Sequence, residues 1–323
     1  MKREGYVFEK IISMDTLREA HRLAKRGKSH YREVIKVEKD PESHLRYLKD
    51  LLELGLFSTS PYRKSLRWES KKLRLIHALP YFPDRIVHHA IMLIMGDKWQ
   101  RSLIRDTFQS LPGRGTSDAR KRVQKAIQVH KPKYYLQIDV KKFYPSIKNW
   151  VLTDIVDRTV KCKRAKLLLC EIIGSCEGLP IGNYVSQILG NLTLSPVDWY
   201  AKQHLGMKHY FRYCDDIVIL HDDPDVLASV NKKIEAKINS YELQVKSNWC
   251  IRSVENDGLD FCGYVFRHSS LRLRQSIVEG LALAIHERRV KSIISYWGWV
   301  KPLNNLGLWQ KAKEVLYENR ITI

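Results

Sequence analysis

Apolar residues recur at helical spacing in the first part of the chain. Residues 15–27 and 41–54 carry them three and four positions apart, with an acidic residue or Pro-Glu near each start, which predicts two amphipathic helices. The next segment alternates basic and apolar residues and then passes through Pro80 and Pro83 into an apolar stretch near 84–97. This pattern predicts a basic β-hairpin followed by a buried helix.

Strands and helices alternate in the middle of the chain. A basic, Gly-containing loop leads into a helix within 108–130, and "KYYLQIDVKKFYPSI" at 133–147 predicts a strand that ends at Asp139. The elements that follow are two helices near 148–160 and 163–174, a loop and helix from 176, a hairpin at 211–220, a helix over 225–243 and a strand pair near 244–266. Residues 276–323 show helical spacing only. The alternation predicts an α+β fold with helical segments on both sides.

Charge and cysteine usage narrow the possible partners. The 323 residues include 56 Lys and Arg against 35 Asp and Glu, a formal net charge of +21. This excess favours a polyanionic partner, because binding phosphates releases counterions; a basic surface without a specific partner is the alternative. The six cysteines form no CxxC pair, and the sequence has no apolar leader and no run of about 18 apolar residues. We expect a reduced, cytoplasmic protein without a membrane span.

Two neighbouring aspartates stand out in "FRYCDDIVIL". Asp215 and Asp216 lie between strand-like apolar runs, most simply at the tight turn of a hairpin, where two carboxylates repel unless a cation or proton intervenes. A second pair, Asp222 and Asp223, precedes a proline at a predicted helix start, where acidic residues favour the helix N-terminus. We interpret the second pair as structural and the first as a candidate cation site.

Asp139 adds a third carboxylate. It ends an otherwise apolar strand, where a charge is unfavourable without a partner. Mg²⁺ takes oxygen ligands and often binds one or two carboxylates together with substrate phosphates. Three carboxylates from two strands could hold two Mg²⁺ ions about 4 Å apart, one activating a 3′-hydroxyl and the other stabilising a leaving pyrophosphate. The pattern predicts nucleotidyl transfer with two Mg²⁺ ions, for which Mn²⁺ could substitute.

Several ordered motifs resemble those of reverse transcriptases. "DVKKFYPSI", "GLPIGNYVSQ", "YCDD", a Lys-containing segment and "LDFCGYVF" follow the order of motifs A to E, and "KKLRLIHALPYFPDRIVHHAI" and "PGRGTSDA" resemble the finger motifs before them. The resemblance covers residues 60–300. It implies a right-hand polymerase whose palm is an antiparallel sheet with helices on one face. The implied parts are an N-terminal extension and fingers over 1–132, a palm over 133–268 with the motif B loop at 176–190, and a helical thumb over 269–323.

The resemblance also implies catalytic roles. Asp139, Asp215 and Asp216 would form the metal-binding triad, with the backbone carbonyl of Val140 as a further ligand. Lys246 would be the lysine that protonates pyrophosphate, although the spacing around "LQVKSNW" is loose.

Two further groups match positions that contact nucleotide or nucleic acid. In the dNTP-binding group, Lys72 and Arg74 match finger cations that hold a triphosphate. Tyr144 matches an aromatic steric gate that occupies the space of a ribose 2′-hydroxyl. The motif B positions of this group are Ile181, Gly182 and Gln187. In the nucleic-acid-binding group, Arg114 lies in the PGRG loop and Tyr213 is the tyrosine of YCDD. The primer-grip hairpin supplies Phe261, Gly263 and Tyr264. The alternatives are a core aromatic for Tyr144, a solvated strand face for Lys72 and Arg74, and a plain turn for Arg114.

Motif B departs from the usual pattern of the family. Most reverse transcriptases read QGxxxSP, whereas this chain reads IGNYVSQ from Ile181 to Gln187. IGxxxSQ is similar to the enzymes of diversity-generating retroelements, which copy a template-repeat RNA, misincorporate opposite adenine and act with a small basic accessory protein. An apolar Ile181 cannot donate the hydrogen bond of a Gln, and such a contact contributes about 1 kcal/mol to discrimination. The alternative is that Ile181 only packs.

The resemblance therefore implies an error-prone RNA-directed DNA polymerase, bacterial or phage-encoded, whose partners are template RNA, primer, cDNA, dNTPs and an accessory protein. Three other functions stay open: a group II intron-like reverse transcriptase, an abortive-infection type enzyme that polymerises without a template, and a non-catalytic RNA-binding protein that keeps the polymerase fold. Three clustered carboxylates argue against the last, because they disfavour RNA binding.

Overall fold

Four helices open the chain in the computed structural model, which describes residues 5–69, 72–303 and 307–321. Ser13 and Asp40 begin the two longer ones by accepting the backbone N–H groups of Thr16 and Ser43. These two helices were predicted, whereas the two shorter ones are too brief to show a helical period in the sequence. The four are α1 (Val7–Ile11), α2 (Met14–Ala24), α3 (Arg32–Glu38) and α4 (Pro41–Glu53).

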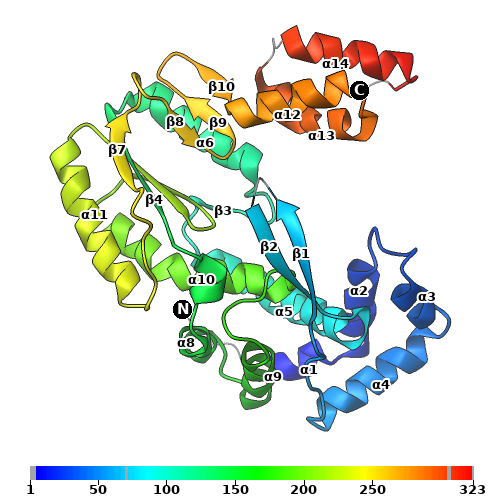
Figure 1. Ribbon diagram of the computed structural model, residues 1–323. Helices are drawn as coiled ribbons and strands as arrows, with labels where there is room; N and C mark the ends of the chain where they lie inside the picture. Colours follow the sequence, from blue (N-terminus) through cyan, green and yellow to red (C-terminus); the bar gives the residue numbers. More distant parts are fainter. Residues whose placement is uncertain (1–4, 70–71, 304–306, 322–323) are drawn as a thin grey trace.

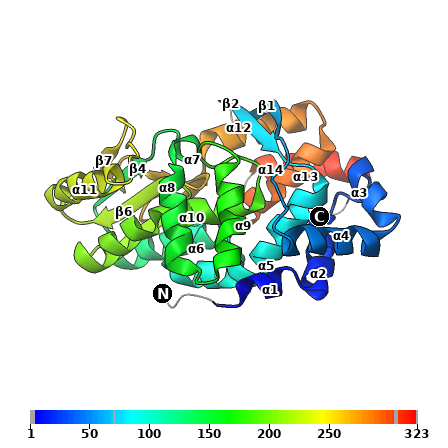
Figure 2. The same cartoon turned by 90° about the horizontal axis from the view of Figure 1, so that it is seen from below.

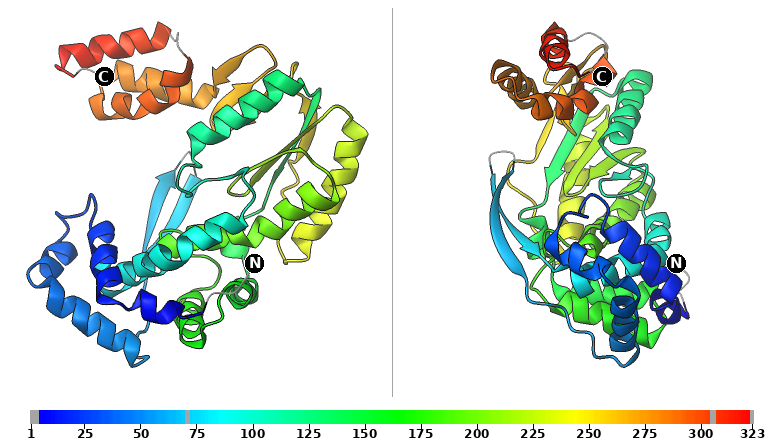
Figure 3. Two further views of the ribbon diagram at one scale, coloured as in Figure 1. Left: turned by 180° about the vertical axis from the view of Figure 1, so that it is seen from behind. Right: turned by 90° about the vertical axis from the view of Figure 1, so that its right-hand side faces the viewer.

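A basic hairpin and a long helix follow, as the alternation predicted. The hairpin pairs β1 with β2 in antiparallel register, with Arg67 opposite Arg74, and it stands away from the helices around it (Figures 1 and 3). The long helix packs against α1 and α2. The elements are β1 (Arg63–Glu69), β2 (Lys72–Ala78), the short η1 (Tyr81–Arg85) and α5 (Ile86–Ser102).

A five-stranded sheet occupies the middle of the molecule. Its order is β3-β5-β6-β4-β7, and every neighbouring pair is antiparallel except β3 with β5. The mixed edge was not predicted, because a strand of two residues leaves no alternation to detect. The strands are β3 (Thr107–Phe108), β4 (Tyr134–Asp139), β5 (His209–Tyr213), β6 (Asp216–His221) and β7 (Cys250–Ser253).

Each face of this sheet belongs to a different hydrophobic core. Leu136 and Ile219 pack with α10 and α11 on one face, whereas Tyr135 and Val218 pack with α6 and a second small sheet on the other. Helix α8 packs against both α9 and α10 (Figure 2). The helices are α6 (Thr116–His130), α7 (Phe143–Ser146), α8 (Asn149–Thr159), α9 (Lys163–Gly174), α10 (Tyr184–Trp199), η2 (Tyr200–His204) and α11 (Pro224–Asn239).

The C-terminal segment is helical, as predicted, but one strand precedes its helices. Leu271 to Leu273 pair with β9 in a three-stranded sheet of order β10-β9-β8. No helix in the described ranges is long and apolar enough to span a membrane. The elements are β8 (Leu259–Phe261), β9 (Tyr264–Phe266), β10 (Leu271–Leu273), α12 (Gln275–His286), α13 (Val290–Val300), η3 (Lys301–Leu303) and α14 (Gly307–Glu318).

Candidate catalytic site

The two neighbouring aspartates lie at a hairpin turn, as predicted. β5 and β6 pair with Tyr213 opposite Asp216, so only Cys214 and Asp215 connect the strands. Cys214 has a φ of 58°, and a positive φ at the first residue is what a two-residue turn of type II′ requires. Asp215 is therefore the second residue of the turn, and Asp216 begins β6.

Asp139 lies directly beside this turn. It is the last residue of β4 and pairs with Asp216, and residues opposite each other in a sheet point to the same face. Burial raises the pKa of Asp215, and the charge of Asp139 raises it further. Burial also raises the pKa of Asp216 to about 7, against a hydrogen bond from Gln137 that lowers it. The three carboxylates therefore share one site and disfavour one another's charge.

Lys246 and Val140 lie next to Asp139. Nζ of Lys246 lies 2.5 Å from Oδ2 of Asp139, and the backbone N–H of Lys246 donates to the Asp139 carbonyl oxygen at 2.8 Å. Val140 is fully buried, bridges to Val245 and donates its N–H to the Asp215 carbonyl oxygen at 3.4 Å. The structure thus places both predicted residues beside the carboxylates, and their catalytic roles stay predictions.

The carboxylates have the chemistry of a divalent-cation site. Oδ1 of Asp139 is buried without a hydrogen-bond partner, and Lys246 is the cation that contacts Oδ2. Among the residues that the structure describes, no three His, Cys, Asp or Glu side chains are already arranged around a metal position. An orphaned carboxylate oxygen next to two carboxyl groups of raised pKa is nevertheless the donor type that Mg²⁺ binds. The donor set fits a divalent cation.

Gln137 holds Asp216 in place and was not predicted. Its Nε2 donates to both carboxylate oxygens of Asp216, at 3.1 and 3.3 Å, and to the carbonyl oxygen of Asp260 at 3.2 Å. The carboxylate of Asp260 in turn accepts from Nε of Arg274, just before α12, at 2.8 and 2.9 Å. These contacts connect the carboxylate of Asp216 to the start of the C-terminal helices. A signal existed: Gln137 is polar within an apolar strand and faces the same side as Asp139.

A fully buried ion pair lies behind the turn. Arg212 and Asp198 have no exposed surface, and Nε and Nη2 of Arg212 donate to the two carboxylate oxygens at 2.7 and 2.6 Å. The remaining N–H groups donate to the side chain and backbone oxygens of Asn191, at 3.2 and 2.9 Å, and to the Cys214 carbonyl oxygen at 2.8 Å. All five guanidinium donors are therefore satisfied. Four of the bonds go to Asn191 and Asp198 of α10 and one goes to Cys214, so Arg212 connects the turn to α10.

Tyr144 lies beside the turn in α7. Its hydroxyl is 3.7 Å from Sγ of Cys214, and a Cβ added at Gly190 would lie 3.3 Å from its ring, so glycine at that position of α10 makes room for the aromatic side chain. Burial raises the pKa of Tyr144, although the side chain remains half-buried. The ring therefore lies between the core and the turn at Cys214, and its role as a steric gate stays a prediction.

The motif B loop is held against β2. The carbonyl oxygen of Ile181 accepts the His77 N–H at 2.9 Å. Gly182 has a φ of 124°, and a Cβ there would lie 2.6 Å from the His77 carbonyl oxygen, so only glycine fits. The same Cβ would lie 3.6 Å from Cγ2 of Ile76, which places the Ile76 face of β2 toward the loop.

The other predicted dNTP-binding residues lie around this contact. Arg74 is exposed and two residues before Ile76, so it shares the face of β2 that is directed to the loop. Lys72 begins β2, and its side chain lies outside the described part of the structure. Gln187 is exposed in the first turn of α10. Arg74 thus lies on the same face of β2 as Ile76, the residue next to Gly182.

The predicted nucleic-acid-binding residues fall into two places. Arg114 donates from Nη1 to the carbonyl oxygen of Ile104 at 3.0 Å, so its guanidinium stabilises the loop that contains it. Tyr213 is half-buried next to the turn at Cys214 and Asp215, with its hydroxyl 3.3 Å from Oγ1 of Thr116 on the adjoining helix α6. The end of the PGRG loop therefore lies beside the residue that precedes this turn.

The primer-grip residues form a tight hairpin at the start of the C-terminal helices. Phe261 pairs with Tyr264, and both turn residues, Cys262 and Gly263, have positive φ, the pattern of a type I′ turn. A Cβ at Gly263 would lie 2.4 Å from the ring of Trp299. Phe261 and Tyr264 are buried in the core shared with α12 and α13, so packing occupies both rings.

Comparison with known proteins agrees with this geometry. Residues 63–266 match the family model described as "Reverse transcriptase (RNA-dependent DNA polymerase)". The match includes β1 to β9, and therefore every carboxylate and motif B residue named above. None of the curated protein sequences matches the chain.

Two solved telomerase structures are similar to this chain. Apo telomerase from Candida tropicalis superposes with a TM-score of 0.51 and 11% identity over 69% of this chain and 50% of that chain. Telomerase from Candida albicans in complex with a TWJ fragment of telomeric RNA gives a TM-score of 0.49 and 12% identity over 72% of this chain and 51% of that chain. The chain thus spans about half the length of these structures. The first supports a right-hand polymerase fold.

Proposed function

Because the chain belongs to the reverse transcriptase family, we propose that it is an RNA-directed DNA polymerase. The observation that carries this proposal is the meeting of Asp139, Asp215 and Asp216 where β4 ends and β6 begins, with a buried carboxylate oxygen that has no partner. The formal charge of +21 supports a nucleic acid as the substrate, because a basic protein attracts a polyanion. The carboxylates form an acidic centre within this basic protein.

The residues around the site have separate tasks in this proposal. Two Mg²⁺ ions bound by the carboxylates would activate the primer 3′-hydroxyl and stabilise the leaving pyrophosphate. Lys246 contacts Asp139 and therefore lies at the proposed metal site. From there it would donate a proton to the pyrophosphate. Gln137 keeps Asp216 oriented through hydrogen bonds to both carboxylate oxygens. Tyr144 favours deoxynucleotides, because its ring lies beside the turn where a 2′-hydroxyl would need space.

We further propose that the enzyme belongs to the diversity-generating class and copies a template-repeat RNA with errors opposite adenine. The support is Ile181, whose backbone is tied to His77 while its side chain offers no hydrogen bond to a nucleotide. Arg74, on the β2 face toward this loop, is charged but not specific for a base. A site with fewer directional contacts accepts mispaired bases more readily. A small basic accessory protein is proposed as a partner that would share the RNA.

Replacing Ile181 with Gln is expected to lower the error rate at template adenines by about fivefold, because one hydrogen bond to the nascent pair contributes about 1 kcal/mol. The fold should be unaffected, since the bond from His77 uses the Ile181 backbone. The measurement is sequencing of cDNA made from an RNA of known sequence by the wild type and the variant.

Ile181→Met is the matched control, because it changes the shape of the side chain without adding polarity. It should leave the error rate close to that of the wild type. An unchanged error rate in Ile181→Gln would show that Ile181 only packs. Wild-type errors no commoner at adenine than at other bases would reject the diversity-generating assignment, and cDNA unrelated to the added RNA would reject templated copying itself.

A further inference from the structure

A series of hydrogen bonds connects Asp216 with the residue that precedes α12. Gln137 donates through its side-chain amide to the Asp216 carboxylate and to the backbone carbonyl oxygen of Asp260 in β8. The Asp260 carboxylate accepts from Nε of Arg274 at 2.8 and 2.9 Å, and Nη2 of Arg274 lies 2.7 Å from its Oδ1. β8 and β9 lie between the central sheet and α12 (Figure 1). We call Gln137, Asp260 and Arg274 the C-terminal link.

The Gln137 amide has no spare donor in this arrangement. Its Nε2 carries two N–H groups and has three acceptors, which are the two Asp216 oxygens at 3.1 and 3.3 Å and the Asp260 carbonyl oxygen at 3.2 Å. The orientation of the amide therefore depends on the position of Asp260 as well as on that of Asp216. A shift of the Asp260 backbone would displace the amide that holds Asp216.

Arg274 connects β8 with the C-terminal helices. Its backbone N–H donates to the Gly263 carbonyl oxygen at 2.9 Å, and its own carbonyl oxygen accepts the Ile277 N–H at 2.9 Å in the first turn of α12. Gly263 packs against these helices, since a Cβ there would lie 2.8 Å from Cδ1 of Ile277 and 2.4 Å from the ring of Trp299. A displacement of α12 and α13 would therefore also displace Arg274 and the β8–β9 hairpin.

The ion pair between Asp260 and Arg274 lies at the surface. The two side chains are 45% and 42% exposed, and pairs this exposed contribute little to folding. Within the described residues, the Asp260 carboxylate has no other hydrogen-bond or ion-pair partner. The pair therefore acts mainly on the position of Asp260, and either partner can be replaced without unfolding the protein.

We propose that the C-terminal link orients Asp216, so that the affinity of the carboxylate site for a divalent cation depends on the position of α12 and α13. The inference rests on the proposed polymerase function and assigns three positioning residues to its metal site. Gln137 touches Asp216, whereas Asp260 and Arg274 act through Gln137. Because such coupling is reciprocal, a bound cation also favours the position of the C-terminal helices that keeps the link intact.

Arg274→Met tests the proposal, because methionine removes the cation and keeps a long unbranched side chain. The dissociation constant of Mn²⁺ is measured by titration calorimetry on the full chain without nucleotide. It should rise about fivefold, somewhat less than is usual for a residue that touches a metal ligand directly. The Mg²⁺ concentration for half-maximal incorporation should rise by the same factor, while the KM for dNTP at saturating Mg²⁺ stays unchanged. Arg274→Lys, which can keep the ion pair, should restore most of the affinity.

Asp260→Ala separates the link from direct binding of nucleic acid by Arg274. It removes the other partner of the ion pair and keeps the backbone carbonyl that Gln137 uses. The link predicts the same loss of Mn²⁺ affinity as in Arg274→Met, and no further loss in the double variant, because both changes break one interaction. Weaker binding of a primer duplex in Arg274→Met, with unchanged Mn²⁺ affinity in Asp260→Ala, would make Arg274 a phosphate contact and overturn the proposal.

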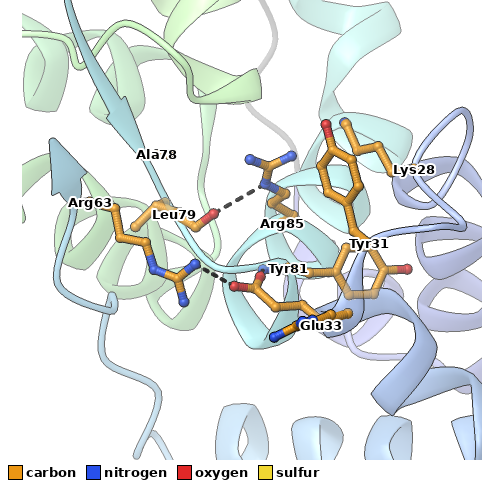
Figure 4. Close-up of a pocket in the computed structure, with 9 residues that line it drawn as sticks. Lys28, Tyr31, Glu33, Arg63, Ala78, Leu79, Tyr81 and Arg85 are labelled. Atoms are coloured by element: carbon orange, nitrogen blue, oxygen red, sulfur yellow. Dashed lines mark hydrogen bonds and ion pairs between the residues drawn. The ribbon is translucent and has the colours of Figure 1, made fainter. Parts of the chain in front are cut away.

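Two ion pairs elsewhere supply matched controls. Arg288→Met breaks the pair with Glu318 within the C-terminal helices, and Arg63→Met breaks the pair with Glu33 at the start of β1 (Figure 4). Both variants should keep the wild-type affinity for Mn²⁺. Unchanged Mn²⁺ affinity in Arg274→Met, an equal loss in the controls, or a wild type that binds no Mn²⁺ would overturn the proposal. Variants that lose affinity as expected, in a protein that extends no primer, would refute the polymerase function and leave the link supported.

Discussion

Replacing Asp215 with Asn is expected to reduce dNTP incorporation on a primed RNA by about a thousandfold, while the protein becomes more resistant to heat. The loss of rate follows from removing a charged metal ligand, which is expected to raise the barrier by about 4 kcal/mol. The gain in stability follows from the raised pKa of Asp215. The stability that Asp215 contributes through this raised pKa is fully present below its ordinary pKa of 3.8. That stability is lost as the pH rises through the pKa that Asp215 has in the folded protein. At pH 8 without divalent cations, the wild type therefore carries repulsion that the variant lacks.

The measurements are single-turnover incorporation with Mg²⁺ and the thermal midpoint in chelator at pH 8. Asp222→Asn is the control, because Asp222 is an exposed acid of the neighbouring pair that only accepts the Lys133 N–H. It should change neither the rate nor the midpoint. An Asp215→Asn variant with wild-type activity would contradict the assignment of the catalytic carboxylates, and a lowered midpoint would contradict the electrostatic account of the site.

Replacing Arg212 with Met is expected to lower the free energy of unfolding by about 3–5 kcal/mol, because Asp198 is left as a buried charge without its cation. Tyr210 donates to Asp198 at 2.6 Å, but a hydroxyl cannot neutralise a carboxylate. Activity should fall further than the loss of folded protein explains, since the Cys214 carbonyl loses its anchor next to the catalytic turn. The unfolding energy is measured by urea denaturation, and the rate is measured on the folded fraction.

A double-mutant cycle separates the ion pair from general damage to the core. Adding Asp198→Asn to Arg212→Met removes the orphaned charge and should recover part of the lost stability. A loss of less than 1 kcal/mol in Arg212→Met, or a double variant that is less stable than Arg212→Met, would mean that the pair contributes little to the fold.

Local patterns in the sequence predicted much of this structure. The hairpin at Cys214 and Asp215, the basic hairpin of β1 and β2, and helices α2 and α4 appear where the periods of apolar residues placed them. These elements depend on near neighbours in the chain, so the alternation and the helix caps carry the information. The meeting of Asp139 with Asp216 was also predictable, because a charge at the end of an apolar strand needs a partner.

The contacts that orient the carboxylates could not be predicted in the same way. Arg212 and Gln137 were visible as polar residues in apolar strands, but their partners, Asp198 and Asp260, lie on other elements, and no local pattern specifies the pairing. No local pattern predicted the burial of Tyr264 against the C-terminal helices either. The family motif suggested a nucleic-acid contact for Tyr264, whereas its ring lies in the core. Long-range packing decides each of these positions.

The most direct test of the central claim is single-nucleotide extension of a primer annealed to RNA by the wild-type protein. Each dNTP is offered alone, with Mg²⁺, on templates that present C, G or U as the next base. If Asp139, Asp215 and Asp216 form a template-directed polymerase site, only the complementary deoxynucleotide is added at each base, and a chelator stops the reaction. No addition under any condition, or the same nucleotide added whatever the template base, would contradict the account.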